Sequence, residues 1–352
     1  MSTPTGKTSR RTWWVLAVCA ALAALAGGFY LTGTSATDTA TSQRMVCPLP
    51  DDTRSKHPGM VWVPGGTFTM GDTVYPEEQA LVPRSMAGFW MGRTEVTNAE
   101  FARFVAATGY VTVAERAVDV AAHPGLPAAM QQPGAVVFVK PNDLARGGDV
   151  RQWWQYLPGA SWRSPLGPQS SIAGREAFAV VAVTHEDAAA YARWLGHELP
   201  SEAQWEWAAR AGVQEANGST VQPAQANTWQ GMFPLQDTAG DGFAGAAPVG
   251  CYAPNAYGLF DMIGNVWELT RDRYQPFHDG RDNLSPDQAP VAQRPGAPGA
   301  QYVIKGGSFL CAPNYCMRYR AGARQPQESD LATSHVGFRT ILMEPQNRSS
   351  KN

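Results

Sequence analysis

The chain has few charged side chains for its length and no excess of either sign. Of its 352 residues, 16% are charged, and the formal net charge is −2. A nucleic-acid-binding domain usually carries a clustered basic face, so we expect no polynucleotide partner. Intrinsic disorder is also excluded, because 44% of the residues are hydrophobic and the charge density is low. The chain is therefore expected to be globular.

Several catalytic signatures are missing as well. The six histidines include no pair at the spacing with which a helix presents two metal ligands. No GxSxG motif marks a serine hydrolase. The run GDGFAG at 240–245 matches the dinucleotide pattern GxGxxG, but it neither follows an expected strand nor opens a helix. A histidine metal centre, a serine hydrolase and a dinucleotide site are all disfavoured.

Small, rigid and aromatic residues are abundant. The 35 Gly, 27 Pro and 12 Trp predict many ordered loops, because Gly and Pro interrupt regular elements while Trp buries a large surface. No internal repeat is evident, and no polar linker divides 47–345. These features predict a single α+β domain with little helix and short strands.

Four local patterns locate elements within this domain. Apolar residues alternate around a Pro-Gly-Gly sequence at 60–71, which predicts a hairpin. Three segments begin with Ser or Thr and carry an acidic or amide side chain three residues later, the pattern of a capping box. They predict helices within 97–109, 184–195 and 201–211.

The N-terminus differs from the rest of the chain. Lys7, Arg10 and Arg11 precede an uncharged stretch whose apolar centre is 13–31. This pattern predicts one membrane anchor with its basic end inside, or alternatively a cleaved export signal. In both cases the remaining chain is extracytoplasmic. The expected division is a basic segment 1–11, an anchor or signal 12–31, a Ser/Thr/Ala-rich tether 32–46, the domain 47–345 and a polar tail 346–352.

Four cysteines follow the apolar segment, at positions 47, 251, 311 and 316. Outside the cytoplasm an even number of cysteines favours disulfides. Cys311 and Cys316 lie in the stretch GGSFLCAPNYCMRYR, where a second interpretation is open. Thiolates are soft ligands, and two of them satisfy copper(I). The residues by themselves allow either a disulfide or a metal and redox site.

Two further stretches are rich in side-chain oxygens. Asn227 and Asp241 lie in the first, and Asp261 and Glu268 in the second. Carboxylate and carbonyl oxygens are the ligands that calcium prefers. The alternative is that Asp, Asn and Gly simply form turns here.

Taken in order, these segments resemble one family, the formylglycine-generating enzymes or sulfatase-modifying factors. The resemblance extends from about Met60 to Arg339, and its most specific part is the cysteine pair, which inactive relatives typically lack. The segments that carry it are MVWVPGGTFTMG, EVTNAEFARFVAATGY, WWQYLPGASWRSPLGP, VTHEDAAAYARWLGHELPSEAQWEWAARAG, NAYGLFDMIGNVWELT and KGGSFLCAPNYCMRYRAGARQPQESDLATSHVGFR.

The resemblance implies a fold related to the C-type lectins. It also implies an activity, the oxidation of a cysteine in a Cys-x-Pro-x-Arg motif of an unfolded sulfatase to formylglycine, with molecular oxygen and copper(I). By position, Cys311 and Cys316 would be the copper ligands and Ser308 a polar neighbour in the pocket. Ala312 and Pro313 stand where relatives commonly carry polar or basic residues, a departure that concerns substrate preference.

The calcium ligands follow from the same resemblance, whereas the groove residues are predicted from their aromatic side chains and the disulfide from the expected export of the chain. Asp261 stands where the family is expected to have Asn, and both residues offer an oxygen. Cys47 and Cys251, which are not part of the motif, are predicted to form a structural disulfide. The first calcium set is Asn227, Asp241 and the backbone carbonyls of Thr228 and Phe243. The second set is Asp261, Glu268 and the backbone carbonyls of Gly264 and Val266. The peptide groove would be lined by Trp153, Trp154, Trp162 and Tyr315, with core packing as the alternative for each.

Two other functions remain open. A non-catalytic binding module of the same fold would retain calcium sites while its cysteines form an inert disulfide. A nonheme iron enzyme of the superfamily is disfavoured, because no histidine-pair motif accompanies the domain.

Overall fold

The computed structural model describes residues 45–79, 83–121, 124–141, 152–212, 225–276 and 299–344. The predicted N-terminal anchor or signal, most of the tether and the polar tail lie outside these residues. No helix in the described ranges has the length and apolar character needed to cross a membrane.

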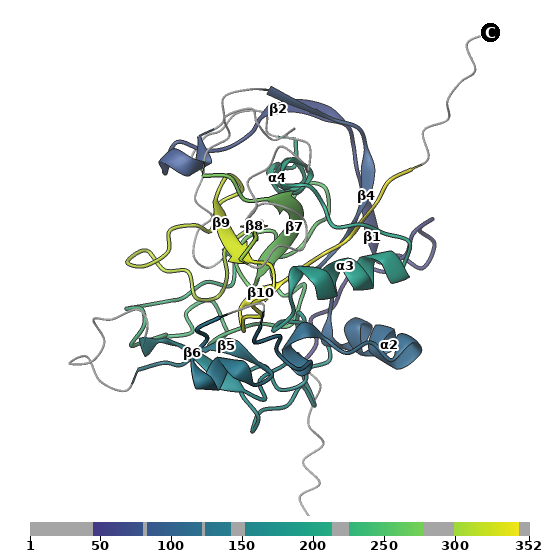
Figure 1. The fold of residues 1–352 in the computed structure, drawn as a ribbon. Helices are drawn as coiled ribbons and strands as arrows, with labels where there is room; N and C mark the ends of the chain where they lie inside the picture. The colour runs from purple at the N-terminus through teal and green to yellow at the C-terminus, as the bar shows by residue number, and fades with distance from the viewer. Residues whose placement is uncertain are drawn as a thin grey trace, which may run out of the picture. The chain divides into compact units, whose positions relative to one another are not determined.

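Short strands and a few helices alternate along the chain (Figure 1). In chain order they are β1 (Met60–Val63), β2 (Gly66–Thr69), η1 (Pro76–Glu78), β3 (Pro83–Met86), β4 (Phe89–Gly92), α2 (Asn98–Thr108), η2 (Val113–Glu115), η3 (Ala128–Gln131), β5 (Gly134–Phe138), β6 (Trp154–Pro158), α3 (His185–Trp194), α4 (Glu202–Arg210), β7 (Trp267–Arg273), β8 (Gln301–Lys305), β9 (Arg324–Glu328), β10 (Val336–Gly337) and β11 (Ile341–Leu342).

The strands form several small sheets. One has the order β10-β7-β8-β9, with β10 parallel to β7 and the other pairs antiparallel. Another has the order β1-β4-β11, and β5 pairs with β6. Long loops connect them. The predicted α+β class, low in regular secondary structure, is confirmed.

The predicted hairpin at 60–71 is wrong. β1 pairs with β4 and β2 pairs with β3 (Figure 1), in one continuous antiparallel register from Met60↔Gly92 to Thr69↔Pro83. Pro64 and Gly65 therefore bend a single ribbon instead of reversing the chain. A Cβ at Gly65 would lie 2.7 Å from the Met86 carbonyl oxygen, so glycine is what permits this close approach of the two strands.

The three predicted helices are confirmed as α2, α3 and α4, and each begins with a capping box. In α2 the Thr97 hydroxyl accepts the Glu100 backbone N–H, and the Glu100 carboxylate accepts the Thr97 N–H. These bonds satisfy two N–H groups that an α-helix leaves unpaired at its start. Gly109 ends the helix at φ +67°, the left-handed conformation that glycine adopts without steric cost.

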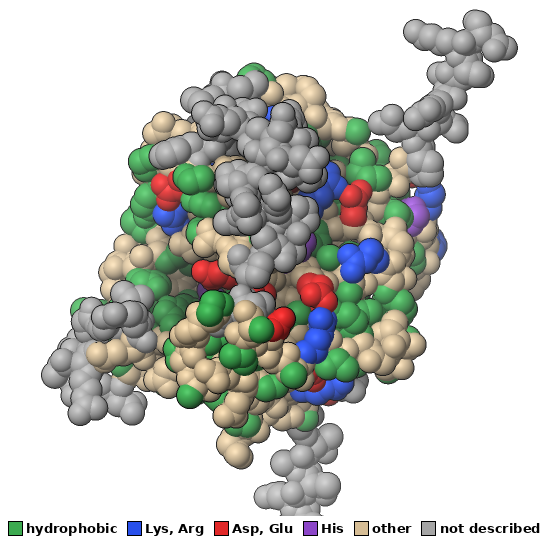
Figure 2. Space-filling view, in the orientation of Figure 1, with side chains coloured by type: hydrophobic (Ala, Val, Ile, Leu, Met, Phe, Trp, Pro, Cys, Tyr) green, Lys and Arg blue, Asp and Glu red, His purple; other side chains and the backbone are tan. Residues whose placement is uncertain are grey.

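The largest core cluster lies between α2, α3 and the β7–β8 sheet. Aromatic rings dominate it, with Phe101 in contact with Trp162, Tyr191 and Phe338. Cys311 belongs to the same cluster. The core therefore supports the cysteine loop from beneath. At the surface, Figure 2 shows basic and acidic side chains interspersed on the visible face instead of gathered by sign.

Candidate functional site

The two cysteines of the GGSFLCAPNYC segment lie in a loop that follows β8. The loop is closed by the Cys311 N–H, which donates to the Ser308 carbonyl at 2.9 Å, and by the Cys316 N–H, which donates to the Ala312 carbonyl at 3.0 Å. The Cys311 and Cys316 sulfur atoms lie 2.7 Å apart. A disulfide bond is about 2.05 Å long, and the two cysteines are free in the structure.

The two thiols occupy different environments. Cys311 is 1% exposed, and burial together with the neighbouring Cys316 raises its pKa well above the usual value, although hydrogen bonds with Ser308 oppose the shift. The pKa of Cys316 is lowered, first by the hydrogen bond from Cys311 and then by the Arg318 backbone N–H and the charges of Arg318 and Arg320. Cys316, which is only partly buried, is therefore the more acidic thiol of the pair.

Buried ion pairs fix the chain that follows Cys316. The Arg320 guanidinium donates to the Met317 carbonyl at 3.1 Å, to Asp72, and to both Glu78 oxygens at 2.9 and 2.7 Å. Arg320 is 2% exposed. Planar guanidinium groups bind carboxylates in a fixed geometry, so this network holds the turn after Cys316 against the segment around η1.

Aromatic side chains lie beside the cysteine loop. The Tyr315 ring stacks on Phe233 at 4.1 Å with an 11° angle between the planes. Trp153 meets Tyr315 edge-on at 5.6 Å, and the Trp154 indole nitrogen lies 3.5 Å from the Tyr315 hydroxyl. Tyr315 is 38% exposed. Of the four residues predicted to line a groove, Tyr315 and Trp154 reach the surface next to Cys316.

The other two predicted groove residues are core residues. Trp162 is fully buried and packs edge-on against Phe101 at 5.1 Å. It has no exposed surface with which to line a groove, so it takes the alternative role of core packing. Trp153 is 7% exposed and supports Tyr315 and Phe233 from behind. A large ring makes more apolar contacts when it is buried than when it lies at the rim of a groove, and this is the physical reason why both rings lie in the core.

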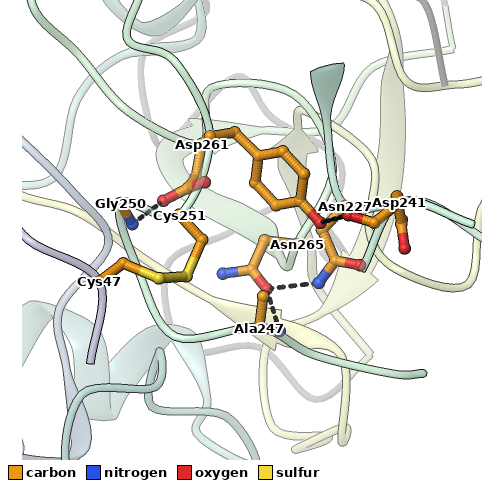
Figure 3. The surroundings of a disulfide bond; sticks show 9 residues. Cys47, Asn227, Asp241, Ala247, Gly250, Cys251, Asp261 and Asn265 are labelled. Carbon is orange, nitrogen blue, oxygen red and sulfur yellow. Dashed lines mark hydrogen bonds between the residues drawn. A yellow bond between two sulfur atoms is a disulfide. The ribbon is translucent and has the colours of Figure 1, made fainter. Parts of the chain in front are cut away.

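The first predicted calcium set contains an unsatisfied oxygen (Figure 3). Asn227 is buried, and its amide nitrogen donates to Asn265 and to the Gly245 carbonyl, both at 3.0 Å. Its Oδ1 atom is buried without a hydrogen-bond partner. Asp241 accepts the backbone N–H of Thr228, and burial raises the pKa of this carboxyl. A buried oxygen without a donor near a carboxylate fits a hard cation.

The second predicted set fits a cation less well. Glu268 accepts Arg339 through two hydrogen bonds, at 2.6 and 2.7 Å, and the Trp205 indole N–H at 2.8 Å. These bonds occupy three of about four lone-pair positions of a carboxylate, and the Arg339 guanidinium already balances its charge. Asp261 accepts the Gly250 N–H at 2.5 Å, and burial raises the pKa of its carboxyl to about 6.

Cys47 and Cys251 are joined by a disulfide, as predicted, with 5.0 Å between their Cα atoms. Figure 3 shows this bond next to Asp261 and Gly250. The disulfide therefore attaches the first described residues to the segment that carries the second acidic set.

Several site residues were not found from the sequence. Glu95 is completely buried, accepts Asn265 at 2.9 Å, and has its pKa raised well above the usual value by burial and by Asp261. Asn314 contacts the backbone of Phe233, 81 positions earlier. No local pattern marks either contact. In the described part of the chain, no three His, Cys, Asp or Glu side chains are grouped as metal ligands.

Together these observations define an α+β domain with long ordered loops that carries a free, asymmetric cysteine pair beside aromatic side chains. A profile described as "Sulfatase-modifying factor enzyme 1-like domain" matches residues 48–343. The chain belongs to this family, the family of the formylglycine-generating enzymes.

Individual relatives agree with this membership. The chain is 48% identical to the "Formylglycine-generating enzyme" of Mycobacterium tuberculosis, over 80% of this chain and 97% of that protein. It is 34% identical to the mouse protein named "Inactive C-alpha-formylglycine-generating enzyme 2", over 83% and 88% respectively. The solved structure of PvdO from Pseudomonas aeruginosa has the same fold, with a TM-score of 0.52 at 25% identity over 80% of this chain and 93% of that one.

Proposed function

We propose that this protein oxidises a cysteine within a Cys-x-Pro-x-Arg motif of an unfolded sulfatase to formylglycine, with copper(I) and molecular oxygen. The observation that carries the proposal is the free cysteine pair, with Cys311 buried, Cys316 partly exposed and the sulfur atoms 2.7 Å apart. A non-catalytic module would have no need of an accessible, unbonded cysteine pair.

Copper(I) fits the donor set. Cys311 and Cys316 supply two soft sulfur ligands, and the lowered pKa of Cys316 favours metal binding because only the deprotonated form coordinates. Metal binding would have to separate the two sulfurs. Bound copper(I) would supply the electron-rich centre at which oxygen is activated. A nonheme iron centre has less support, since the described residues group no histidines and carboxylates as ligands.

The chain's own residues would bind and orient the reactants. Ser308 and the Arg318 N–H hydrogen-bond the two sulfurs, and the Arg320 ion pairs hold the turn between them and η1. Tyr315 and Trp154 offer an apolar surface for an extended peptide. Such positioning lowers the entropic cost of bringing several reactants together.

The overall reaction must balance electrons. Conversion of the CH₂–SH group to an aldehyde releases hydrogen sulfide and removes two electrons, whereas reduction of O₂ to two oxygen atoms at the oxidation level of water takes four. A two-electron reductant, such as a dithiol, must supply the other two electrons, and the net reaction releases one molecule of water. The assay therefore includes a dithiol.

The experiment measures the mass of a Cys-x-Pro-x-Arg peptide after incubation with the protein, copper(I), oxygen and a dithiol. An aldehyde product that reacts with a hydrazide supports the proposal. Absence of the aldehyde with fully metal-loaded protein refutes it.

We also propose a structural calcium ion at the first set, where the unpartnered Asn227 Oδ1 lies in the same segment as Asp241. The expected result is that calcium raises the thermal unfolding temperature of the wild type and not that of Asn227→Leu. Differential scanning calorimetry with calcium and with a chelator checks this. Equal stabilisation of both proteins would contradict it.

We propose an extracytoplasmic location, attached to the membrane through the N-terminal apolar segment. The Cys47–Cys251 disulfide supports it, because disulfides persist mainly in oxidising compartments. Protease added to intact cells or spheroplasts should cleave the domain. Full protection of the domain would contradict the location.

A further inference from the structure

Asn314 forms an unusual link between the cysteine loop and a second loop. Its amide nitrogen donates to the Phe233 carbonyl at 3.0 Å, and its Oδ1 accepts the Phe233 N–H at 3.4 Å. One side chain thus pairs both backbone polar groups of a residue 81 positions away. The following residue, Pro234, has no N–H to contribute.

The linked residue lies at the centre of the aromatic surface. Phe233 is 4% exposed and contacts Tyr315 at 4.1 Å, Trp229 at 4.9 Å and Trp153 at 5.5 Å. Tyr315 is the residue between Asn314 and Cys316. The Asn314 amide and the Phe233–Tyr315 stack therefore hold the same two loops together at adjacent positions.

The surface held in place is apolar and accessible. Met232, next to Phe233, is 61% exposed, Tyr315 is 38% exposed and Met317 is 39% exposed. Tyr315 and Met317 are the sequence neighbours of the partly buried Cys316, and Met232 is the neighbour of Phe233, which stacks on Tyr315. Exposed apolar side chains on two linked loops, one of which carries the cysteine pair, indicate a surface for a bound ligand.

The cysteine pair itself does not depend on this link. Cys311 is held by Ser308, and Cys316 by the Ala312 carbonyl and the Arg318 N–H. The loss of the Asn314 amide would loosen the 232–233 segment, which would keep only its ring contacts to the cysteine loop, and would leave the contacts of both sulfurs in place.

We infer that Asn314 is a positioning residue for substrate binding: it fixes the Met232–Phe233 segment against the cysteine loop so that both loops contact the peptide around the target cysteine. This inference rests on the proposed function. It separates two roles within one six-residue loop, with the cysteines for chemistry and Asn314 for peptide binding.

Two variants test the link. Asn314→Leu has nearly the same size and removes both hydrogen bonds, whereas Asn314→Asp keeps an acceptor for the Phe233 N–H and places an oxygen against the Phe233 carbonyl. Both are expected to weaken peptide binding about tenfold, because the Met232–Phe233 segment is no longer held in position by the Asn314 side chain. The matched control is Asn255→Leu. The Asn255 side chain also holds a loop in place, because it donates a hydrogen bond to the Ala208 carbonyl and accepts one from the Leu259 N–H.

Binding of a fluorescent Cys-x-Pro-x-Arg peptide is measured by anisotropy without oxygen, and turnover is measured separately with oxygen and copper(I). The inference predicts a raised Kd and KM for both Asn314 variants with kcat within about twofold of the wild type, and an unchanged Kd for Asn255→Leu. Hydrogen exchange at the Phe233 amide should increase in Asn314→Leu, which shows that the link is broken.

The outcomes distinguish the two proposals. If the wild type binds the peptide without oxidising it, the proposed function fails, and the Kd values still decide the role of Asn314. If Asn314→Leu exchanges faster at Phe233 and binds the peptide as tightly as the wild type, the inference is overturned. An equal rise in Kd for Asn255→Leu would also overturn it, because the effect would then be general loosening.

Discussion

Removal of the Cys47–Cys251 disulfide should destabilise the domain strongly. The perturbation is the double variant Cys47→Ala/Cys251→Ala, which leaves the other two described cysteines unchanged. The two residues are separated by 204 positions, so the bond closes a very long loop in the unfolded chain. In the chain-entropy description, such a loop lowers the conformational entropy of the unfolded state and thereby stabilises the folded state.

The magnitude follows from the loop length. For a closed loop of 204 residues, the entropy relation gives about 5 kcal/mol at 25 °C. Measured disulfide contributions are usually smaller, about 2–4 kcal/mol. We therefore expect the double variant to lose about 3–5 kcal/mol of unfolding free energy and to show a larger urea m-value, because its unfolded chain exposes more surface.

Urea unfolding followed by tryptophan fluorescence measures both quantities. The matched control is the wild type in a reductant strong enough to open this disulfide, which should unfold like the double variant without further loss. The reasoning is refuted if the oxidised wild type and the double variant unfold at the same urea concentration, or if reduction destabilises both proteins equally.

Three further predictions concern burial and charge. Arg339→Met leaves the Glu268 carboxylate buried and unpaired and should cost about 3–5 kcal/mol in urea unfolding; a loss below about 1 kcal/mol would show that the pair is not buried in solution. In metal-free reduced protein, iodoacetamide should modify Cys316 before Cys311, and Cys316 should keep more of its reactivity than an ordinary cysteine thiol as the pH falls, because its pKa is lowered whereas that of Cys311 is raised; peptide mapping that finds Cys311 modified first contradicts this order. Trp162→Ala should lower the unfolding free energy by about 3–5 kcal/mol. The KM of the folded fraction should not change, and a higher KM under conditions in which the variant is fully folded would show that Trp162 contacts the substrate.

Local signals in the sequence predict the helices well. Thr97, Thr184 and Ser201 each precede a matching side chain three residues later, and all three helices begin there. Capping depends on neighbours within one turn, so sequence patterns detect it reliably. The α+β class follows for a similar reason, since Gly, Pro and Trp content limits the length of regular elements.

Strand pairing could not be predicted in the same way. The Pro-Gly-Gly sequence at 64–66 has the composition of a turn, yet the partner strands at 83–92 pair across it in one register. The choice between a turn and a bend depends on which strand is available elsewhere in the chain. Turn composition alone carries no information about that partner.

In the candidate site, too, contacts between residues close in sequence could be predicted, and contacts between distant residues could not. Cys311 and Cys316 could be selected because they lie close together in a motif, and their sulfurs do meet. Asn314 and Phe233 are far apart in sequence and meet only in the folded chain. The residue type alone could not distinguish the buried Trp162 from the more accessible Trp154, because a large aromatic ring suits both core packing and a substrate-binding surface.

The central claim is that the Cys311–Cys316 pair binds copper(I) for peptide oxidation. The most direct measurement is the rate of formylglycine formation as copper(I) is added stepwise to metal-free protein, for the wild type and for Cys316→Ser. The account predicts a rate that saturates at about one copper per chain in the wild type and no product from the variant at any copper level. Formylglycine formation by Cys316→Ser, or by the wild type with copper removed, would contradict it.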